Sequence, residues 1–402
     1  MISEISRKLK RIFFSAITIR IGVAAVAFLS GVVINRSIGI EQKGSYSSIL
    51  SFSNYIQMIM GLGICFSYSR MISKYGEKDG KDTVITLIWT QTLLFLVLFL
   101  AFSFVFPMDK TTIYVLVLSI LIICNSQISF ISVIDEIKKR NIIVLICSII
   151  GLGFNLVCFF GFWGNLDAVV IFLIIKYIIE TLFLAYSNEY FIFCFKCLTK
   201  EKVFYVLKLG IPTALMNLLI TCNYNIDIIM LNCFKSEKIQ IGIYGVAYSL
   251  SNMLWIVPDA FKELVYNKTA KGVNPKHVLE CIKINILICT ILCLGFNVFG
   301  KLFLKIVYGE EYIVAYQVTF LLFCGVIPMV AYKLIHPIYV NEGKTLSVAM
   351  LLIVAVTFNI IASYILIPTH GALGAAIASV VSYSVCGVLF FLRFYIEYYK
   401  RV

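Results

Sequence analysis

Four ionisable side chains lie inside long apolar runs, where a charge is costly and by default marks a functional site. Arg20 lies about 12 Å along the first run at 1.5 Å per residue, and its guanidinium can donate two parallel hydrogen bonds to a phosphate. Lys176 and Glu180 are spaced i, i+4, so on a helix they share a face. Asp227 is the fourth. No histidine accompanies a nucleophile in a catalytic arrangement, so these residues predict binding of charged groups rather than an enzyme.

Most of these charges also have a purely structural interpretation. Arg20 can extend its guanidinium to the membrane surface, and Lys176 and Glu180 can neutralise each other. Lys333 and Asp259 lie near the ends of apolar runs, where such residues are expected to reach the surface or cap a helix. Both interpretations stay open at this point.

The elements that carry these residues must be membrane-spanning helices. Of the 402 residues 61% are hydrophobic and 14% charged, with a mean hydropathy of +0.96, whereas about 25% of an ordinary globular domain is charged. The net charge of +13 comes from short basic clusters between apolar runs, which is the pattern of membrane topology rather than of a nucleic-acid-binding face.

Long apolar windows predict an all-α polytopic membrane protein of about twelve transmembrane helices. With the N-terminus in the cytoplasm, 24 of the 34 lysines and arginines fall on the cytoplasmic side and 7 on the other. Both termini are therefore predicted to be cytoplasmic. The predicted spans are 12–34, 46–69, 83–106, 112–134, 142–162, 168–188, 210–233, 241–262, 278–299, 313–335, 345–367 and 371–394.

The cysteines and histidines predict no metal centre. The thirteen cysteines are scattered through apolar stretches, and the closest pair, Cys194 and Cys197, has no second pair and no histidine near it. This pattern supports neither a zinc site nor a disulfide framework. The three histidines, His277, His336 and His370, are isolated from one another.

Two segments near the starts of predicted spans repeat each other. Residues 44–54 and 242–252 both begin Gly-x-Tyr, at Gly44 and Tyr46 and at Gly242 and Tyr244, and are identical at five of eleven positions. The offset of 198 residues is close to half the chain. It predicts two six-helix bundles, 1–195 and 210–402, related by a pseudo-two-fold axis and joined by a cytoplasmic linker, 196–209.

Three motifs resemble those of polysaccharide repeat-unit flippases (Wzx type) of the multidrug/oligosaccharidyl-lipid/polysaccharide exporter superfamily. Residues 36–46, RSIGIEQKGSY, resemble the R-x-L-G-x-E-x-x-G-x-Y stretch after the first helix of that family. Residues 225–230, NIDIIM, resemble its seventh-helix aspartate motif, and the glycines of 371–379 resemble its last-helix pattern. Ile40 stands where related loops commonly have proline, so this motif is less specific for one subfamily than for the superfamily.

The resemblance implies export of an undecaprenyl-diphosphate-linked oligosaccharide repeat unit, for O-antigen or another surface polysaccharide, across the bacterial cytoplasmic membrane. Such a protein needs a wet cationic cavity, because diphosphate and sugars cannot cross hydrocarbon unaided. We expect Arg20 to hold the diphosphate and Lys176 to line the cavity, with Tyr46 and Tyr244 facing sugars. Packing between helices is the other interpretation of the two tyrosines. A polymerase and a chain-length protein are the implied partners.

Energy is expected from H⁺ or Na⁺, with no other cofactor. Asp227 matches the family's aspartate and is the first candidate for binding the ion, and Glu180 is the second. The alternative for Asp227 is a hydrogen bond to the neighbouring Asn223 or Asn225.

Three other protein classes compete with this assignment. A multidrug or cation exporter of the same superfamily predicts an acidic cavity, which Arg20 and Lys176 disfavour. A membrane polysaccharide polymerase or ligase predicts a large exterior loop rich in arginine, and a major-facilitator transporter predicts an Asp-Arg pair in its loop motif. Neither feature occurs in the sequence.

Overall fold

The chain is an all-helical membrane protein, as the sequence predicts. The structure, a computed structural model, describes residues 2–161, 164–269 and 275–398. Within those ranges nine helical stretches are long and apolar enough to cross a membrane. They comprise α1 (Ile2–Met60), α3 (Glu77–Val105), α4 (Lys110–Gly161), α5 (Leu166–Ser187), α6 (Lys200–Cys233), α7 (Lys238–Leu254) continued by α8 (Ile256–Thr269), α9 (Pro275–Val307), α10 (Tyr316–Asn341) and α11 (Thr345–Tyr398). The short elements are η1 (Ile64–Ser67), α2 (Tyr68–Tyr75), η2 (Phe195–Cys197) and η3 (Glu310–Ala315).

Three of the nine stretches are broken once, so the described residues supply twelve helical segments. α1 breaks at Gly39 (φ 70°, ψ 173°), α4 at Glu136 (φ −152°, ψ 78°) and α11 at Gly371 (φ 53°, ψ −127°). Glycine suits the two positive φ angles because it has no Cβ. The breaks at Gly39 and Glu136 lie between two predicted spans, and Gly371 is the first residue of the predicted span 371–394. The predicted fold class is confirmed, and a break at one residue replaces the expected loop in these three places.

The chain divides into two compact units that do not follow a single cut in the sequence. Unit 1 comprises Met1–Ile38 and Ile49–Leu218, and unit 2 comprises Gly39–Ser48 and Leu219–Val402. The ten residues after the break in α1 therefore pack with the second half of the chain. The boundary near residue 218 falls inside the continuous helix α6. The predicted boundaries at 195 and 209, and the pseudo-two-fold axis, stay predictions.

The polar interior of unit 1 contains hydrogen-bonded amides and phenols. Gln127 Nε2 donates to Gln91 Oε1 at 2.8 Å, which links α4 to α3. The buried phenols of Tyr68 and Tyr190 both donate to the carboxylate of Asp135, at 2.9 and 2.6 Å. Burial, and then the bond to Asp135, raises the pKa of Tyr68 and of Tyr190, so both phenols remain protonated donors.

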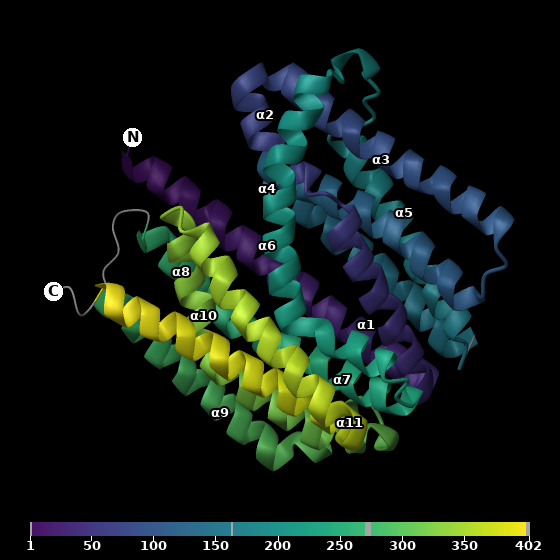
Figure 1. The fold of residues 1–402 in the computed structure, drawn as a ribbon, viewed down its shortest axis with the longest axis vertical. Helices are drawn as coiled ribbons and strands as arrows, with labels where there is room; N and C mark the ends of the chain where they lie inside the picture. Colours follow the sequence, from purple (N-terminus) through teal and green to yellow (C-terminus); the bar gives the residue numbers. More distant parts are fainter. Residues whose placement is uncertain (1, 162–163, 270–274, 399–402) are drawn as a thin grey trace. The chain divides into compact units, whose positions relative to one another are not determined.

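In unit 2, α10 and α11 pack side by side with close backbone contact (Figure 1). A Cβ added to Gly387 on α11 would lie 2.0 Å from the carbonyl oxygen of Pro328 on α10. Only glycine allows so close an approach between two helices. This packing fixes one side of α11, and the polar residues described below lie on the part of α11 that faces α6.

Candidate functional site

A buried carboxylate is the centre of the candidate site in unit 2. Asp227 lies on α6 and is fully buried. Ser379 Oγ donates to its Oδ2 at 2.7 Å, and Ser363 Oγ lies 3.5 Å from its Oδ1. Ser379 Oγ also lies 3.0 Å from the phenol oxygen of Tyr244, and Ser363 Oγ donates to Asn359 Oδ1 at 3.0 Å. Helices α6, α7 and both parts of α11 therefore each contribute to one cluster.

The cluster offers many oxygen atoms and few protons. Two serine hydroxyls and one phenol supply one proton each, and Ser363 Oγ lies closer to Asn359 Oδ1, at 3.0 Å, than to Asp227 Oδ1, at 3.5 Å. Among the residues that the structure describes, no lysine, arginine or histidine lies within ion-pair distance of Asp227. A buried carboxylate without a cationic partner carries a large desolvation cost unless it binds a proton or a cation. Oxygen ligands of this kind suit a small hard cation.

A second polar row lies one helical turn away. Asn223, i−4 from Asp227 on α6, accepts a hydrogen bond from Ser382 Oγ at 2.7 Å. Asn223, Asn359 and Ser382 are all fully buried. The alternative of a hydrogen bond between Asp227 and Asn223 or Asn225 is wrong, because the serine hydroxyls that bond to Asp227 come from α11. The polar pairs 223/227 and 359/363 are each spaced i, i+4. This spacing was the sequence signal for the polar contacts between α6 and α11.

The repeated Gly-x-Tyr segments meet each other within unit 2. A Cβ added to Gly44 would lie 1.9 Å from the carbonyl oxygen of Lys238, and one added to Gly242 would lie 2.0 Å from that of Ile40. The segment Gly39–Ser48 and α7 thus touch backbone to backbone at the two glycines that begin the repeat. We refer to this contact as the glycine crossing.

Both predicted sugar-binding tyrosines lie next to the glycine crossing and are buried. Tyr46 is 6% exposed, and Tyr244 is fully buried with its hydroxyl near Ser379. Tyr244 therefore connects the crossing to the Asp227 cluster. The ammonium group of Lys43 lies 5.0 Å from the centre of the Tyr46 ring, and Lys43 is only 6% exposed. The position of Lys43 between the predicted spans 12–34 and 46–69 gave no sign of this burial.

The other predicted site residues lie elsewhere in the chain. Lys176 and Glu180, on α5 in unit 1, form an ion pair at 2.5 Å, with side-chain exposures of 20% and 6%. Arg20 lies on α1, and its side chain is outside the described part of the structure. Lys333 and Asp259 form an ion pair at 2.8 Å in unit 2, with side-chain exposures of 15% and 50%, and Asp259 lies in the first turn of α8.

Removing one member of the Lys176–Glu180 pair is expected to destabilise the protein. Glu180→Gln leaves an ammonium group largely buried without its partner, which costs about 3 kcal/mol. The double variant Lys176→Met with Glu180→Leu removes both charges and should unfold thermally close to wild type. A double variant as unstable as Glu180→Gln would contradict this account of the pair's stability.

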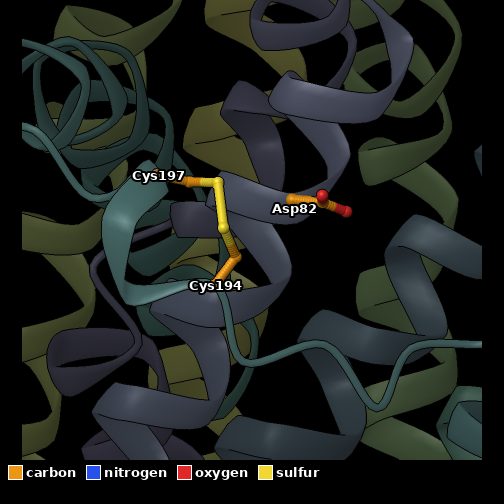
Figure 2. Close-up of side chains that lie close together, drawn as sticks. All are labelled: Asp82, Cys194 and Cys197. Carbon is orange, nitrogen blue, oxygen red and sulfur yellow. A yellow bond between two sulfur atoms is a disulfide. The ribbon is translucent and has the colours of Figure 1, made fainter.

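The closest cysteine pair is bonded in the structure, although the sequence pattern supported no disulfide framework. Cys194 and Cys197 form a disulfide on the loop that contains η2, and Asp82 of α3 lies beside it (Figure 2). This cluster belongs to unit 1 and is separate from the Asp227 cluster.

Comparison with known proteins agrees with this architecture. Residues 9–257, more than half of the chain, match the family model described as "Polysaccharide biosynthesis protein". No curated protein sequence matches the chain.

Solved membrane transporters share the fold at low sequence identity. The lipid II flippase MurJ in an inward closed conformation has a TM-score of 0.77 and 16% identity, over 94% of this chain and 87% of that chain. An inward-facing multidrug resistance MATE family transporter of the MOP superfamily has a TM-score of 0.67 and 16% identity, over 93% and 94%. A mutant of the Vibrio cholerae MATE transporter VcmN has a TM-score of 0.55 and 13% identity, over 98% and 96%. These neighbours are transporters and not catalytic enzymes. The chain is therefore a multi-pass membrane protein that belongs to the polysaccharide biosynthesis protein family and has the fold of MOP-superfamily transporters.

Proposed function

We propose that the protein is a flippase for undecaprenyl-diphosphate-linked oligosaccharide repeat units in the cytoplasmic membrane of a bacterium. The observation that carries this proposal is the combination of the family match over residues 9–257 with a transporter fold over nearly the whole chain. The similar MurJ structure is described as a lipid II flippase, which is a transporter of a lipid-linked substrate. The family match favours this substrate class over the drugs or cations of the MATE transporters that share the fold.

In this proposal the Asp227 cluster couples translocation to H⁺ or Na⁺. A site that is filled in one conformation and empty in another can bias the equilibrium between them by its differential affinity. The cluster supports this role because α6, α7 and both parts of α11 supply its oxygen atoms. Small movements of any of these helices would change the number of oxygens around the ion.

The proposed contacts with substrate involve two kinds of residue. Arg20 binds the diphosphate by two parallel hydrogen bonds, and Lys176 is a second cation once Glu180 releases it. Tyr46 and Tyr244 reach the sugars only after the glycine crossing opens, because both are buried when it is closed. A polysaccharide polymerase and a chain-length protein are the proposed partners at the outer leaflet.

An apolar groove in unit 2 supports a lipid-linked substrate. Its volume is about 560 Å³, and Leu292, Phe296, Phe299 and Phe303 of α9 are among its lining residues. A polyprenyl chain can lie against such a surface while its polar head crosses the membrane, held by van der Waals packing as lipid-exposed apolar groups are.

Loss of the protein is expected to trap repeat units on the cytoplasmic face. In a deletion strain, lipid-linked repeat units should accumulate, and in inside-out membrane vesicles they should be accessible to a glycan-oxidising or lectin probe. Restoring the wild-type gene should clear them, and Arg20→Ala should restore less export at equal membrane abundance. Normal delivery of repeat units to the outer leaflet in the deletion strain would refute the proposed function.

A further inference from the structure

A second cluster of potential ligands lies in unit 1, away from the proposed coupling site. It consists of the sulfur atoms of Cys194 and Cys197 and a carboxylate oxygen of Asp82, all within 4.8 Å of one another. Figure 2 shows that the two cysteines come from one loop and Asp82 from helix α3. All three residues are partly exposed, so solutes can reach the cluster.

The loop is held on α3 by contacts at Cys194 and before it. The backbone N–H of Cys194 donates to Thr86 Oγ1 at 3.0 Å, one turn after Asp82 on the helix. Trp89 Nε1 donates to the carbonyl oxygen of Tyr190 at 2.7 Å, and the Trp89 ring stacks on Phe191 at 5.7 Å. These contacts hold the backbone of the loop from Tyr190 to Cys194 against the helix that carries Asp82.

The carboxylate of Asp82 has no other partner among the described residues. No hydrogen bond or ion pair occupies it there, whereas Asp79, one turn earlier, pairs with Lys202 at 2.6 Å. Two thiolates and one carboxylate are a ligand set that suits Zn²⁺, with a fourth position left for water. The loop and the start of α3 fall on the predicted cytoplasmic side, where thiols are kept reduced.

We infer that the reduced Cys194–Cys197 pair and Asp82 bind one Zn²⁺, which clamps the loop to α3. Reduction by a cytosolic thiol donor breaks the S–S bond, giving two thiols, while the donor is oxidised to its own disulfide. Both thiols then lose a proton as their sulfurs bind the metal. The disulfide is the metal-free form of the same site. This inference does not depend on the proposed flippase function.

Metal content of the purified full-length protein tests the inference. The protein is reduced with a phosphine, equilibrated with Zn²⁺ and separated from free metal. We expect about one tightly held Zn²⁺ per chain, and a sulfur-to-metal charge-transfer band when Co²⁺ replaces it. Cys194→Ser and Cys197→Ser should abolish both signals. Asp82→Asn should weaken binding by about ten- to a hundredfold, since even outer-shell partners of a metal have effects of that size.

Cys293→Ser is the matched control. The sulfur of Cys293 also lies near a second sulfur, that of Cys324, at 3.6 Å. This pair involves neither Asp82 nor the loop that contains Cys194 and Cys197. This variant should keep wild-type zinc content. Zinc binding that survives both Cys194→Ser and Cys197→Ser would overturn the inference. So would a reduced wild-type protein that holds no zinc, because the pair would then be a redox-active dithiol only.

Discussion

Asp227→Asn is expected to abolish ion-driven translocation while leaving a folded protein in the membrane. Asparagine has nearly the same shape and keeps one oxygen for Ser379, but it carries no charge to neutralise a bound cation and cannot bind a proton at neutral pH. A hydrogen bond to a charged group is worth about 1.5–3 kcal/mol. Losing such an interaction lowers ion affinity by about ten- to a hundredfold or more. The measurement is substrate translocation in proteoliposomes under an imposed Na⁺ or H⁺ gradient.

Two serine variants provide a matched comparison for Asp227→Asn. Ser379→Ala removes the shortest hydrogen bond to the carboxylate and should reduce gradient-driven translocation by a smaller factor. Ser249→Ala should have little effect, because Ser249 donates only to the carbonyl oxygen of Gly245 in its own helix. If Asp227→Asn translocates with an unchanged response to both gradients, the cluster is structural and the coupling ion binds elsewhere.

Gly44→Ala is expected to prevent the glycine crossing from closing. Its effect on translocation should be the second largest, after that of Asp227→Asn. The new Cβ would lie 1.9 Å from the carbonyl oxygen of Lys238, and a backbone atom cannot move aside as a side chain can. The two helices must therefore separate, at a cost of at least about 1–3 kcal/mol. Gly242→Ala should act in the same way, because its Cβ meets the carbonyl oxygen of Ile40 at 2.0 Å. We expect both variants to lose most translocation.

Cross-linking can follow the position of the segment Gly39–Ser48 at its contact with α6, beside the glycine crossing. Ser48 Oγ donates to Asn232 Oδ1 of α6 at 3.0 Å, so Ser48→Cys with Asn232→Cys should be joined by a short bifunctional thiol reagent. Adding Gly44→Ala should lower the yield about tenfold if the closed state loses 1.4 kcal/mol. Gly31→Ala is the control, because its Cβ would meet no atom within 4 Å. An unchanged yield in the Gly44→Ala background would show that the helices adapt without separating.

The apolar pattern of the sequence was sufficient to predict the fold class and the approximate spans. Hydropathy accumulates along consecutive residues, so a window of about 20 residues reports a membrane crossing without knowledge of the rest of the chain. The same windows separated the spans near Gly39, Glu136 and Gly371. They could not show that the helix is interrupted there at only one residue, because hydropathy carries no information on backbone dihedral angles.

The candidate site was predictable only in part. Asp227 stood out because a carboxylate inside an apolar run is unusual. Its partners did not, since Ser363 and Ser379 lie 136 and 152 residues further along the chain and are ordinary small residues in helices. The glycine repeat was visible in the sequence, but the mutual contact of its two copies was not.

Three charged or reactive groups show the same limit. Lys43 lies between the predicted spans 12–34 and 46–69, and the packing of Gly39–Ser48 into unit 2 is what buries it. The spacing of Cys194 and Cys197 did not predict their disulfide, and the neighbouring carboxylate came from a helix more than a hundred residues earlier. Sequence alone thus determined which segments enter the membrane, because that free energy adds up residue by residue. Tertiary structure decided which polar groups meet, because a contact depends on both helices and on the glycines that let them approach.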